Sequence, residues 1–127
     1  MRNNYYNKPN IILIILDTVR ADHLSCYGYH KNTTPNIDLI AKEGVLYLNA
    51  ISQSPWTLPS HASIFTGTYL SKHRTDIDNK KLNPKLMTIT EYLSNKADYK
   101  CYGISNNVWV SREFNFNRGF HQFYHFV

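Results

Sequence analysis

The chain has 127 residues, of which 43% are hydrophobic and 14% aromatic, and it carries a formal net charge of +5. This length suits one domain with a modest core, and the composition excludes a disordered chain. The positive charges form no dense run, so the sequence gives little support to a nucleic-acid platform and we expect no nucleic-acid partner.

The chain begins with a polar N-terminal extension, residues 1–9, which precedes the first apolar run. That run, Ile11–Leu16, is only six residues long, which is too short for a signal-peptide core or a membrane span. We therefore expect a cytoplasmic protein with no membrane partner. Cys26 and Cys101 match neither a CxxC pair nor a zinc spacing, so we expect reduced thiols that serve packing.

The run Ile11–Leu16 is continuously aliphatic and does not alternate with polar residues. Such a run is typical of a central strand in a parallel sheet that has helices on both faces. Asp17 stands where this strand should end. Because ligands of open α/β sheets bind outside the carboxyl ends of the strands, Asp17 is a candidate functional acid. The alternative is an aspartate that caps the following turn.

Residues 34–44 carry the signals of a helix in order. Thr34 is the expected N-cap, Pro35 takes the first helical position, and Gly44 ends the helix after an apolar stripe. The residues that follow, 45–51, are rich in β-formers and alternate loosely, which predicts a second strand.

The stretch from Ser54 to Gly67 predicts a loop that leads into a short helix. Thr57 is the expected N-cap, Pro59 lies in the first turn, and Gly67 supplies a left-handed stop. The N-terminus of such a helix directs unpaired N–H groups and a partial positive charge at the loop, which suits an anion. Thr57 is therefore either a nucleophile beside that anion or the cap of an ordinary helix.

The second half of the chain begins with a polar connection, residues 68–85, that shows no periodicity. Residues 88–97 open with a capping box and predict a helix, and residues 99–105 predict a third strand. The aromatic tail, residues 108–127, is expected to pack irregularly over the sheet edge. The order strand, helix, strand, helix, helix, strand predicts an α/β fold with a parallel sheet, right-handed crossovers and flanking helices.

Three motifs follow one another in a recognisable order. Asp17-Thr-Val-Arg20 ends the first strand, the 34–44 helix comes next, and Trp56-Thr-Leu-Pro-Ser-His-Ala-Ser-Ile-Phe-Thr-Gly67 follows. The tail adds Arg118-Gly-Phe-His-Gln-Phe123. This ordered set resembles the N-terminal portion of the sulfatase family, within the alkaline phosphatase superfamily. The resemblance implies a metal-dependent hydrolase of sulfuric or phosphoric esters that acts on a small anionic substrate.

By this resemblance, Thr57 occupies the nucleophile position. The family's motif there is Cys/Ser-x-Pro-x-Arg, whose first residue is converted to formylglycine in true sulfatases, whereas this chain has Thr57-Leu-Pro-Ser-His61. Threonine is not a known substrate for that conversion, but threonine nucleophiles occur in related phosphodiesterases and phosphotransferases of the superfamily. The resemblance also implies a divalent metal, calcium first, with magnesium, manganese or zinc as alternatives. Asp17 and Thr57 are its expected ligands.

Four further residues are candidates for the site. His61, one turn after Thr57, could face the same anion, or it could be a partly exposed surface histidine. Asn106 or Asn107 could hydrogen-bond an ester oxygen where the family places a Lys-Trp-His group, although a turn after a strand favours asparagine anyway. Lys72 could contact the substrate, but solvation at the surface is the simpler interpretation for it and for the neighbouring His73.

Asp17 and Thr57 supply at most two metal ligands, whereas a catalytic metal usually needs three or more. In the family the remaining ligands come from the second half of a much longer chain. We therefore expect residues 1–127 to form an incomplete, truncated sulfatase N-terminal domain that is inactive alone, with a second chain as a possible source of the C-terminal half. The alternative is a non-catalytic remnant or an anion-binding module.

Overall fold

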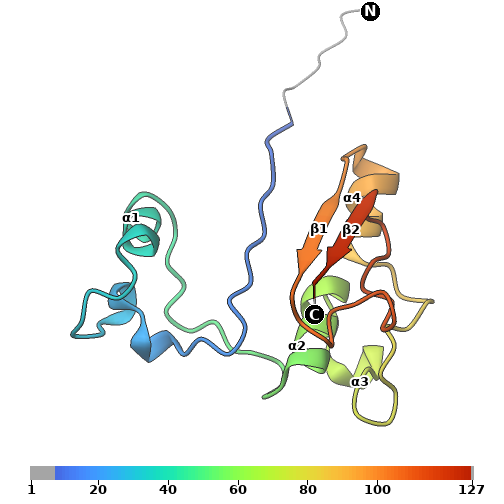
Figure 1. Ribbon diagram of the computed structural model, residues 1–127, viewed down its shortest axis with the longest axis horizontal. Coiled ribbons are helices and arrows are strands. Elements are labelled where there is room, and N and C mark those ends of the chain that lie inside the picture. The colour runs from blue at the N-terminus through green and yellow to red at the C-terminus, as the bar shows by residue number, and fades with distance from the viewer. Residues whose placement is uncertain (1–7, 127) are drawn as a thin grey trace, which may run out of the picture. The chain divides into compact units, whose positions relative to one another are not determined.

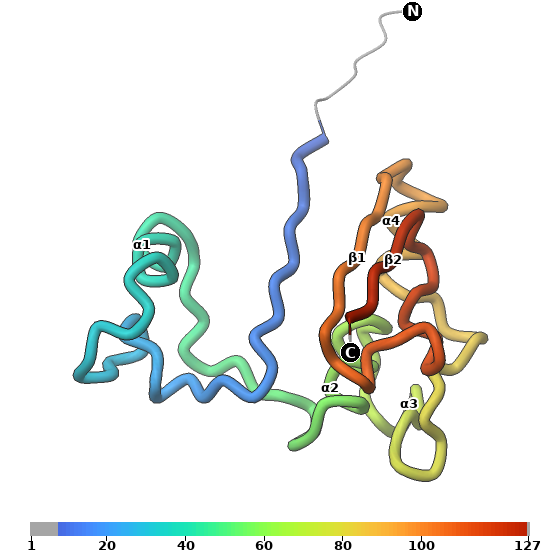
Figure 2. Tube along the Cα trace, viewed as in Figure 1, coloured from blue at the N-terminus to red at the C-terminus, as the bar shows by residue number. Residues whose placement is uncertain are grey.

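The computed structural model describes residues 8–126, drawn as a ribbon in Figure 1 and as a tube in Figure 2. Most of the predicted polar extension, residues 1–9, thus lies outside the described residues. The chain divides into two units, Met1–Asn49 and Ala50–Val127, and each is described by itself. Within residues 8–126 there is no helix of the length and apolar character needed to cross a bilayer.

The first unit contains two 3-10 turns, Ala21–His23 and Ser25–Tyr27, and the helix α1, Pro35–Glu43. The prediction of α1 is confirmed, with Thr34 before it and a glycine after it. The Thr34 hydroxyl accepts no backbone N–H of the helix and donates to the Asp38 carboxylate over 3.3 Å. The same hydroxyl accepts a hydrogen bond from the backbone N–H of Ser25 over 3.1 Å, which closes the loop between the 3-10 turns and α1.

Two of the predicted strands are not formed. Residues 11–16 and 45–51 are not strands in the structure, so the prediction that they build a parallel sheet is wrong for this part of the chain. A strand needs a ladder of backbone hydrogen bonds to a neighbouring strand, and no such ladder joins either segment to another described segment. The six aliphatic side chains of residues 11–16 are accordingly 37–83% exposed.

The second unit holds the sheet and most of the helices. Its elements are α2, Thr57–Thr66; α3, Leu70–His73; α4, Ile89–Ala97; β1, Tyr102–Ser105; and β2, Gln122–His125. β1 and β2 run parallel and pair from Tyr102 opposite Gln122 to Ser105 opposite His125 (Figure 1). The helix α4 and the strand β1 are confirmed, and the parallel sheet is confirmed in this two-stranded form. The expectation of an irregular tail is wrong for its residues 122–125, which form β2, whereas residues 108–121 form neither helix nor strand.

A capping box and an arginine hold α4 against the tail. The Thr88 hydroxyl accepts the backbone N–H of Glu91 over 3.2 Å, and Glu91 Oε2 accepts the backbone N–H of Thr88 over 2.8 Å, as predicted. Arg118 from the tail then pairs with both oxygens of Glu91, at 3.0 and 2.8 Å. The three side chains join segments almost thirty positions apart in the sequence.

The core of the second unit is built on one face of α2. Leu58, Ala62 and Phe65, spaced i, i+4 and i+7, are 0–7% exposed. The remaining buried members of the cluster are Leu82, Val110, Phe114 and Phe116, with Trp56, Trp109 and Phe120 packed against it. Phe65 meets Phe116 edge to face, with ring centroids 5.3 Å apart. This contact fixes the rotation of α2, and therefore the direction in which its other side chains point.

The cysteines are unpaired, as predicted. Cys101 is buried at the start of β1 and its Sγ lies 3.7 Å from the backbone oxygen of Thr90, whereas Cys26 in the first unit is partly exposed.

Candidate functional site

Thr57 is the first residue of α2. The residue before it, Trp56, has an extended backbone (φ −138°, ψ 164°) and is the N-cap, so the prediction that Thr57 caps the helix is wrong by one position. The side chain of Trp56 makes no capping hydrogen bond, and Pro59 falls in the first turn, where a missing N–H removes no helical bond. Gly67 closes the helix at φ 63°, the predicted left-handed stop.

His61 lies one turn beyond Thr57 and is buried, with 6% of its surface exposed. The interpretation of His61 as a partly exposed surface histidine is therefore wrong, because α2 turns this side chain toward the packed interior. Its Nδ1 lies 2.8 Å from the backbone oxygen of Thr57. A carbonyl oxygen can only accept, so Nδ1 carries a proton and donates it. Only Nε2 is left for a further contact.

Asp17 belongs to the first unit, whereas Thr57 belongs to the second. Asp17 is partly buried and lies in a turn that the backbone N–H of Val19 closes onto the oxygen of Leu16, over 3.4 Å. Thr18, next in that turn, has a φ of 63°, which is uncommon for a residue with a branched side chain. The two predicted metal ligands thus belong to different units.

Lys72 and His73 were both expected at the surface, and the structure separates them. Lys72 is exposed on α3, but His73 is fully buried, so the prediction is wrong for His73. The imidazole lies 2.9 Å from the hydroxyl of Ser63 and 3.0 Å from the backbone N–H of Thr75. Burial lowers the pKa of His73, with the nearby carboxylate of Asp76 acting in the opposite direction.

Asn106 and Asn107 follow β1, as predicted. Asn106 is exposed, whereas Asn107 is partly buried. The side-chain oxygen of Asn107 accepts the backbone N–H of Trp109 over 2.9 Å, and its backbone N–H donates to the hydroxyl of Ser105 over 3.2 Å. Asn107 therefore serves the turn after the strand, the alternative that turn chemistry favours. Asn106 is the better placed of the two to meet a ligand from solvent.

The donors offered by Asp17 and Thr57 suit a hard divalent cation in kind. Calcium and magnesium take oxygen ligands, carboxylates above all, and a threonine hydroxyl also offers an oxygen. Two ligands are too few for a complete metal shell. Among residues 8–126 no three His, Cys, Asp or Glu side chains form a metal-binding group. The residues present fit part of a metal shell.

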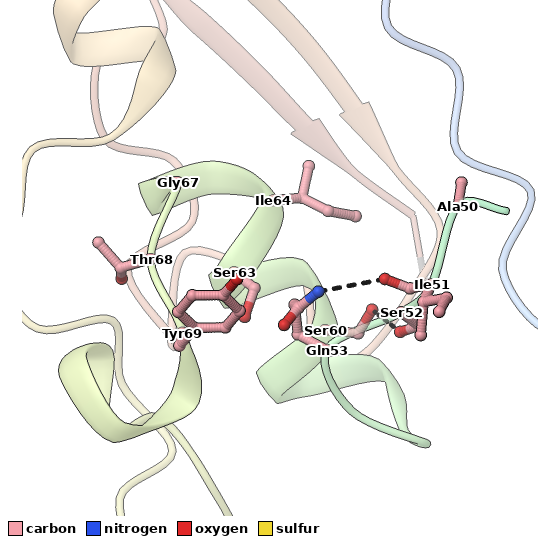
Figure 3. A pocket seen from close by; sticks show the side chains of 10 residues that line it. All are labelled: Ala50, Ile51, Ser52, Gln53, Ser60, Ser63, Ile64, Gly67, Thr68 and Tyr69. Carbon is pink, nitrogen blue, oxygen red and sulfur yellow. Dashed lines mark hydrogen bonds between the residues drawn. The ribbon is translucent and has the colours of Figure 1, made fainter. Parts of the chain in front are cut away.

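A hollow of about 510 Å³ lies beside α2 in the second unit (Figure 3). It is lined by Ala50, Ile51, Ser52, Gln53, Ser60, Ser63, Ile64, Gly67, Thr68 and Tyr69. The hollow was not predicted from the sequence, although small or polar residues recur along α2 at i, i+3 and i+7 (Ser60, Ser63 and Gly67). Its remaining wall comes from the segment before the helix, and helix periodicity alone does not bring that segment to this face.

Comparison with known proteins gives a consistent result. The family model described as Sulfatase matches residues 9–127. Human arylsulfatase D is 39% identical over 72 residues, which are 57% of this chain and 12% of that protein. An N-acetylgalactosamine-6-O-sulfatase of Bacteroides thetaiotaomicron is 45% identical over 62 residues, which are 49% of this chain and 12% of that protein.

A third relative covers more of the chain. An ulvan-active sulfatase of Formosa agariphila is 32% identical over 102 residues, which are 73% of this chain and 20% of that protein. In these three relatives the matched region thus spans between 12% and 20% of the relative's length. No solved structure gives a significant match.

Proposed function

Because the chain belongs to the sulfatase family, we propose that it supplies the nucleophile side of a hydrolase site for sulfuric or phosphoric esters. The observation that carries this proposal is the position of Thr57. The family match includes the Thr57–His61 segment, and in the structure that segment is the first turn of α2. A nucleophile at the start of a helix faces the end that carries free N–H groups and partial positive charge.

A threonine hydroxyl is a weak nucleophile at neutral pH and needs activation. A divalent metal, when bound, lowers the pKa of a coordinated hydroxyl and polarises the ester. We propose that Asp17 and Thr57 hold that metal, with calcium first and magnesium, manganese or zinc as alternatives. The N–H groups at the start of α2 would then bind the ester oxygens, which is how helix N-termini commonly receive anions.

His61 enters this proposal through one atom. Its Nδ1 is bonded to the backbone oxygen of Thr57, so Nε2 is the atom that would contact the substrate or take a proton. Lys72 and Asn106 are exposed and are proposed as outer contacts to the anionic substrate, whereas the side-chain oxygen of Asn107 already serves its turn.

Two oxygen ligands do not complete a catalytic metal shell. We propose that the missing ligands come from polypeptide outside this sequence, in a second chain or in a further segment. Residues 1–127 alone would then bind the anion and the metal weakly and turn over little or no substrate.

Two measurements test this proposal. The first assays the purified chain against aryl sulfates, phosphate monoesters and phosphate diesters, with and without each divalent metal. We expect little or no turnover, and robust turnover that Thr57→Ala abolishes would refute the claim of inactivity. Thr66→Ala, at the opposite end of the same helix, is the matched control.

The second measurement is titration calorimetry with sulfate and with calcium. We expect calcium to strengthen sulfate binding, and we expect Asp17→Asn and Thr57→Ala each to remove that gain. Sulfate binding that is unchanged by metal would instead favour the anion-binding module. The start of α2 supports this second candidate too, because the first turn of a helix can receive an anion without a metal. An absence of any sulfate binding would contradict both functions.

A further inference from the structure

We propose that the run Ile11–Leu16 is a self-association surface, which pairs antiparallel with the same run of a second copy of this chain. The run consists of isoleucine and leucine alone and contains no charge, proline or glycine. In the structure it follows an extended course (Figure 2), and its six side chains are 37–83% exposed. A contiguous exposed patch of large aliphatic side chains marks a surface that another molecule covers.

The backbone of the run selects a strand as the covering element. Within residues 8–126 the backbone of residues 11–15 makes no hydrogen bond, and no ladder joins the run to β1 or β2. An extended segment with unpaired N–H and C=O groups is a template for pairing with another chain. Proteins usually protect such edges with lysine, proline or a bulge, and the run contains neither lysine nor proline.

The two faces of the run select a second copy as the partner. Because successive side chains of a strand point to opposite faces, a continuous aliphatic run has two apolar faces. The same run of a second copy offers aliphatic side chains on both faces at every position. β1 does not, because Gly103 and Ser105 occupy one of its faces. The segment 45–51 includes Asn49 and matches less well.

The charges at the two ends of the run set the direction of pairing. Lys8 precedes the run and Asp17 follows it. In an antiparallel pair the Lys8 end of each copy lies beside the Asp17 end of the other, so opposite charges meet twice. In a parallel pair in register, like charges lie beside each other, which is unfavourable. The antiparallel pair also has a two-fold axis that makes its two halves equivalent.

The folded part of the chain limits the association to two copies. In an antiparallel pair the residues that follow Asp17 leave at opposite ends, so the folded units of the two copies do not collide. Further copies would have to stack at about 5–10 Å, the spacing of neighbouring strands and of every second strand. A unit of about 80 residues has a radius of gyration of about 11 Å and does not fit that spacing.

Sedimentation velocity of the purified chain without metal or substrate provides the test, with a reducing agent that prevents a disulfide through Cys26. We expect a reversible monomer–dimer equilibrium with a dissociation constant of about 10–100 μM, because one pair of strands forms a small interface. Ile14→Lys should weaken it at least tenfold. Leu48→Lys and Ile104→Lys, at similarly exposed positions in the 45–51 segment and in β1, should leave it unchanged.

A charge reversal tests the direction. Lys8→Glu should weaken an antiparallel dimer about threefold, because a glutamate then meets Asp17 of the partner, whereas a parallel dimer would only exchange one like pair for another. Lys31→Glu, at another exposed lysine of the first unit, is the matched control.

Three outcomes would overturn the proposal: a monomer up to about 200 μM, species that grow beyond the dimer, or a dimer that Ile104→Lys or Leu48→Lys weakens as strongly as Ile14→Lys. Unchanged tryptophan fluorescence in each variant would show that the second unit, which holds Trp56 and Trp109, is still folded. Since neither an ester nor an anion ligand is present, these outcomes are distinct from failure of the proposed hydrolase function.

Discussion

Replacing Arg118 with methionine should markedly destabilise the second unit. Arg118 makes five hydrogen bonds: two to the carboxylate of Glu91, and one each to the backbone oxygens of Asn83, Pro84 and Leu86. The side chains of the ion pair are only 18% and 21% exposed. The arginine therefore joins α4, the connection before it and the tail at one point.

The magnitude follows from this burial. Breaking a fully buried ion pair costs about 3–5 kcal/mol, whereas a fully exposed pair contributes about 0–1 kcal/mol. With about four-fifths of each side chain covered, and three carbonyls losing their donor, we expect a loss of about 3 kcal/mol in the free energy of unfolding. Methionine keeps most of the aliphatic volume, so the loss measures the charged head.

Denaturant unfolding followed by tryptophan fluorescence provides the assay. Both tryptophans, Trp56 and Trp109, lie in the second unit, so the signal reports that unit alone. Arg112→Met is the matched control, because among residues 8–126 the Arg112 side chain makes one hydrogen bond, to the backbone oxygen of Phe123 over 2.7 Å, and its loss should cost about 1 kcal/mol. Equal losses for the two variants would refute the argument that the paired, covered position of Arg118 sets the cost.

Three further predictions concern a backbone position, a histidine and a thiol. Gly119→Ala should lower the free energy of unfolding by at least about 3 kcal/mol, because its Cβ would meet the backbone of α4 and φ is +78°. Gly67→Ala should lower it by only about 1–2 kcal/mol, because φ is +63° but the space around the Cβ is open. Thermal unfolding of the two variants compares these losses. Burial lowers the pKa of His73 below 6.5, so the unfolded chain binds its proton first and stability should fall as pH drops below that value; His73→Gln should flatten this part of the stability–pH curve. Burial raises the pKa of the Cys101 thiol, so iodoacetamide at pH 8 should modify Cys26 well before Cys101, as read by peptide mass spectrometry.

The helices were predictable because their ends are encoded locally. Thr88 and Glu91 complete a capping box from four consecutive residues, and Gly67 marks a left-handed stop, so α4 and the end of α2 follow from sequence. The start of α2 was placed one position late, because both Trp56 and Thr57 are compatible with an extended backbone and the choice depends on how Trp56 packs against the core.

The strands were less predictable because pairing is not local. Residues 11–16 have the composition of a buried strand, yet no ladder of hydrogen bonds joins them to another segment within residues 8–126, and they remain exposed. The strand β2 was not predicted, although it does find a pairing partner. Its four residues show no clear alternation, and it forms because β1 offers it a parallel edge twenty positions away.

For the candidate site, too, local features were predictable and contacts between distant residues were not. Thr57 and Asp17 were identified from sequence because motif order points to them, and their roles stay predictions. The burial of His73 was not predictable, because it depends on Ser63, ten positions earlier, meeting the imidazole across the turn between α2 and α3. The hollow likewise needs residues 50–53 to fold back along the helix.

The helix α2 links the core to the candidate site. Its rotation about its own axis determines which side chains face the core and which face the site. Leu58 and Phe65 fix that rotation in the core. The same rotation presents Ser63 to the hollow and buries His61, whose ring bonds back to Thr57. A cavity left by Phe65→Ala would therefore loosen more than the core. We infer that anion binding at Thr57 should weaken in that variant, although it alters no residue of the candidate site.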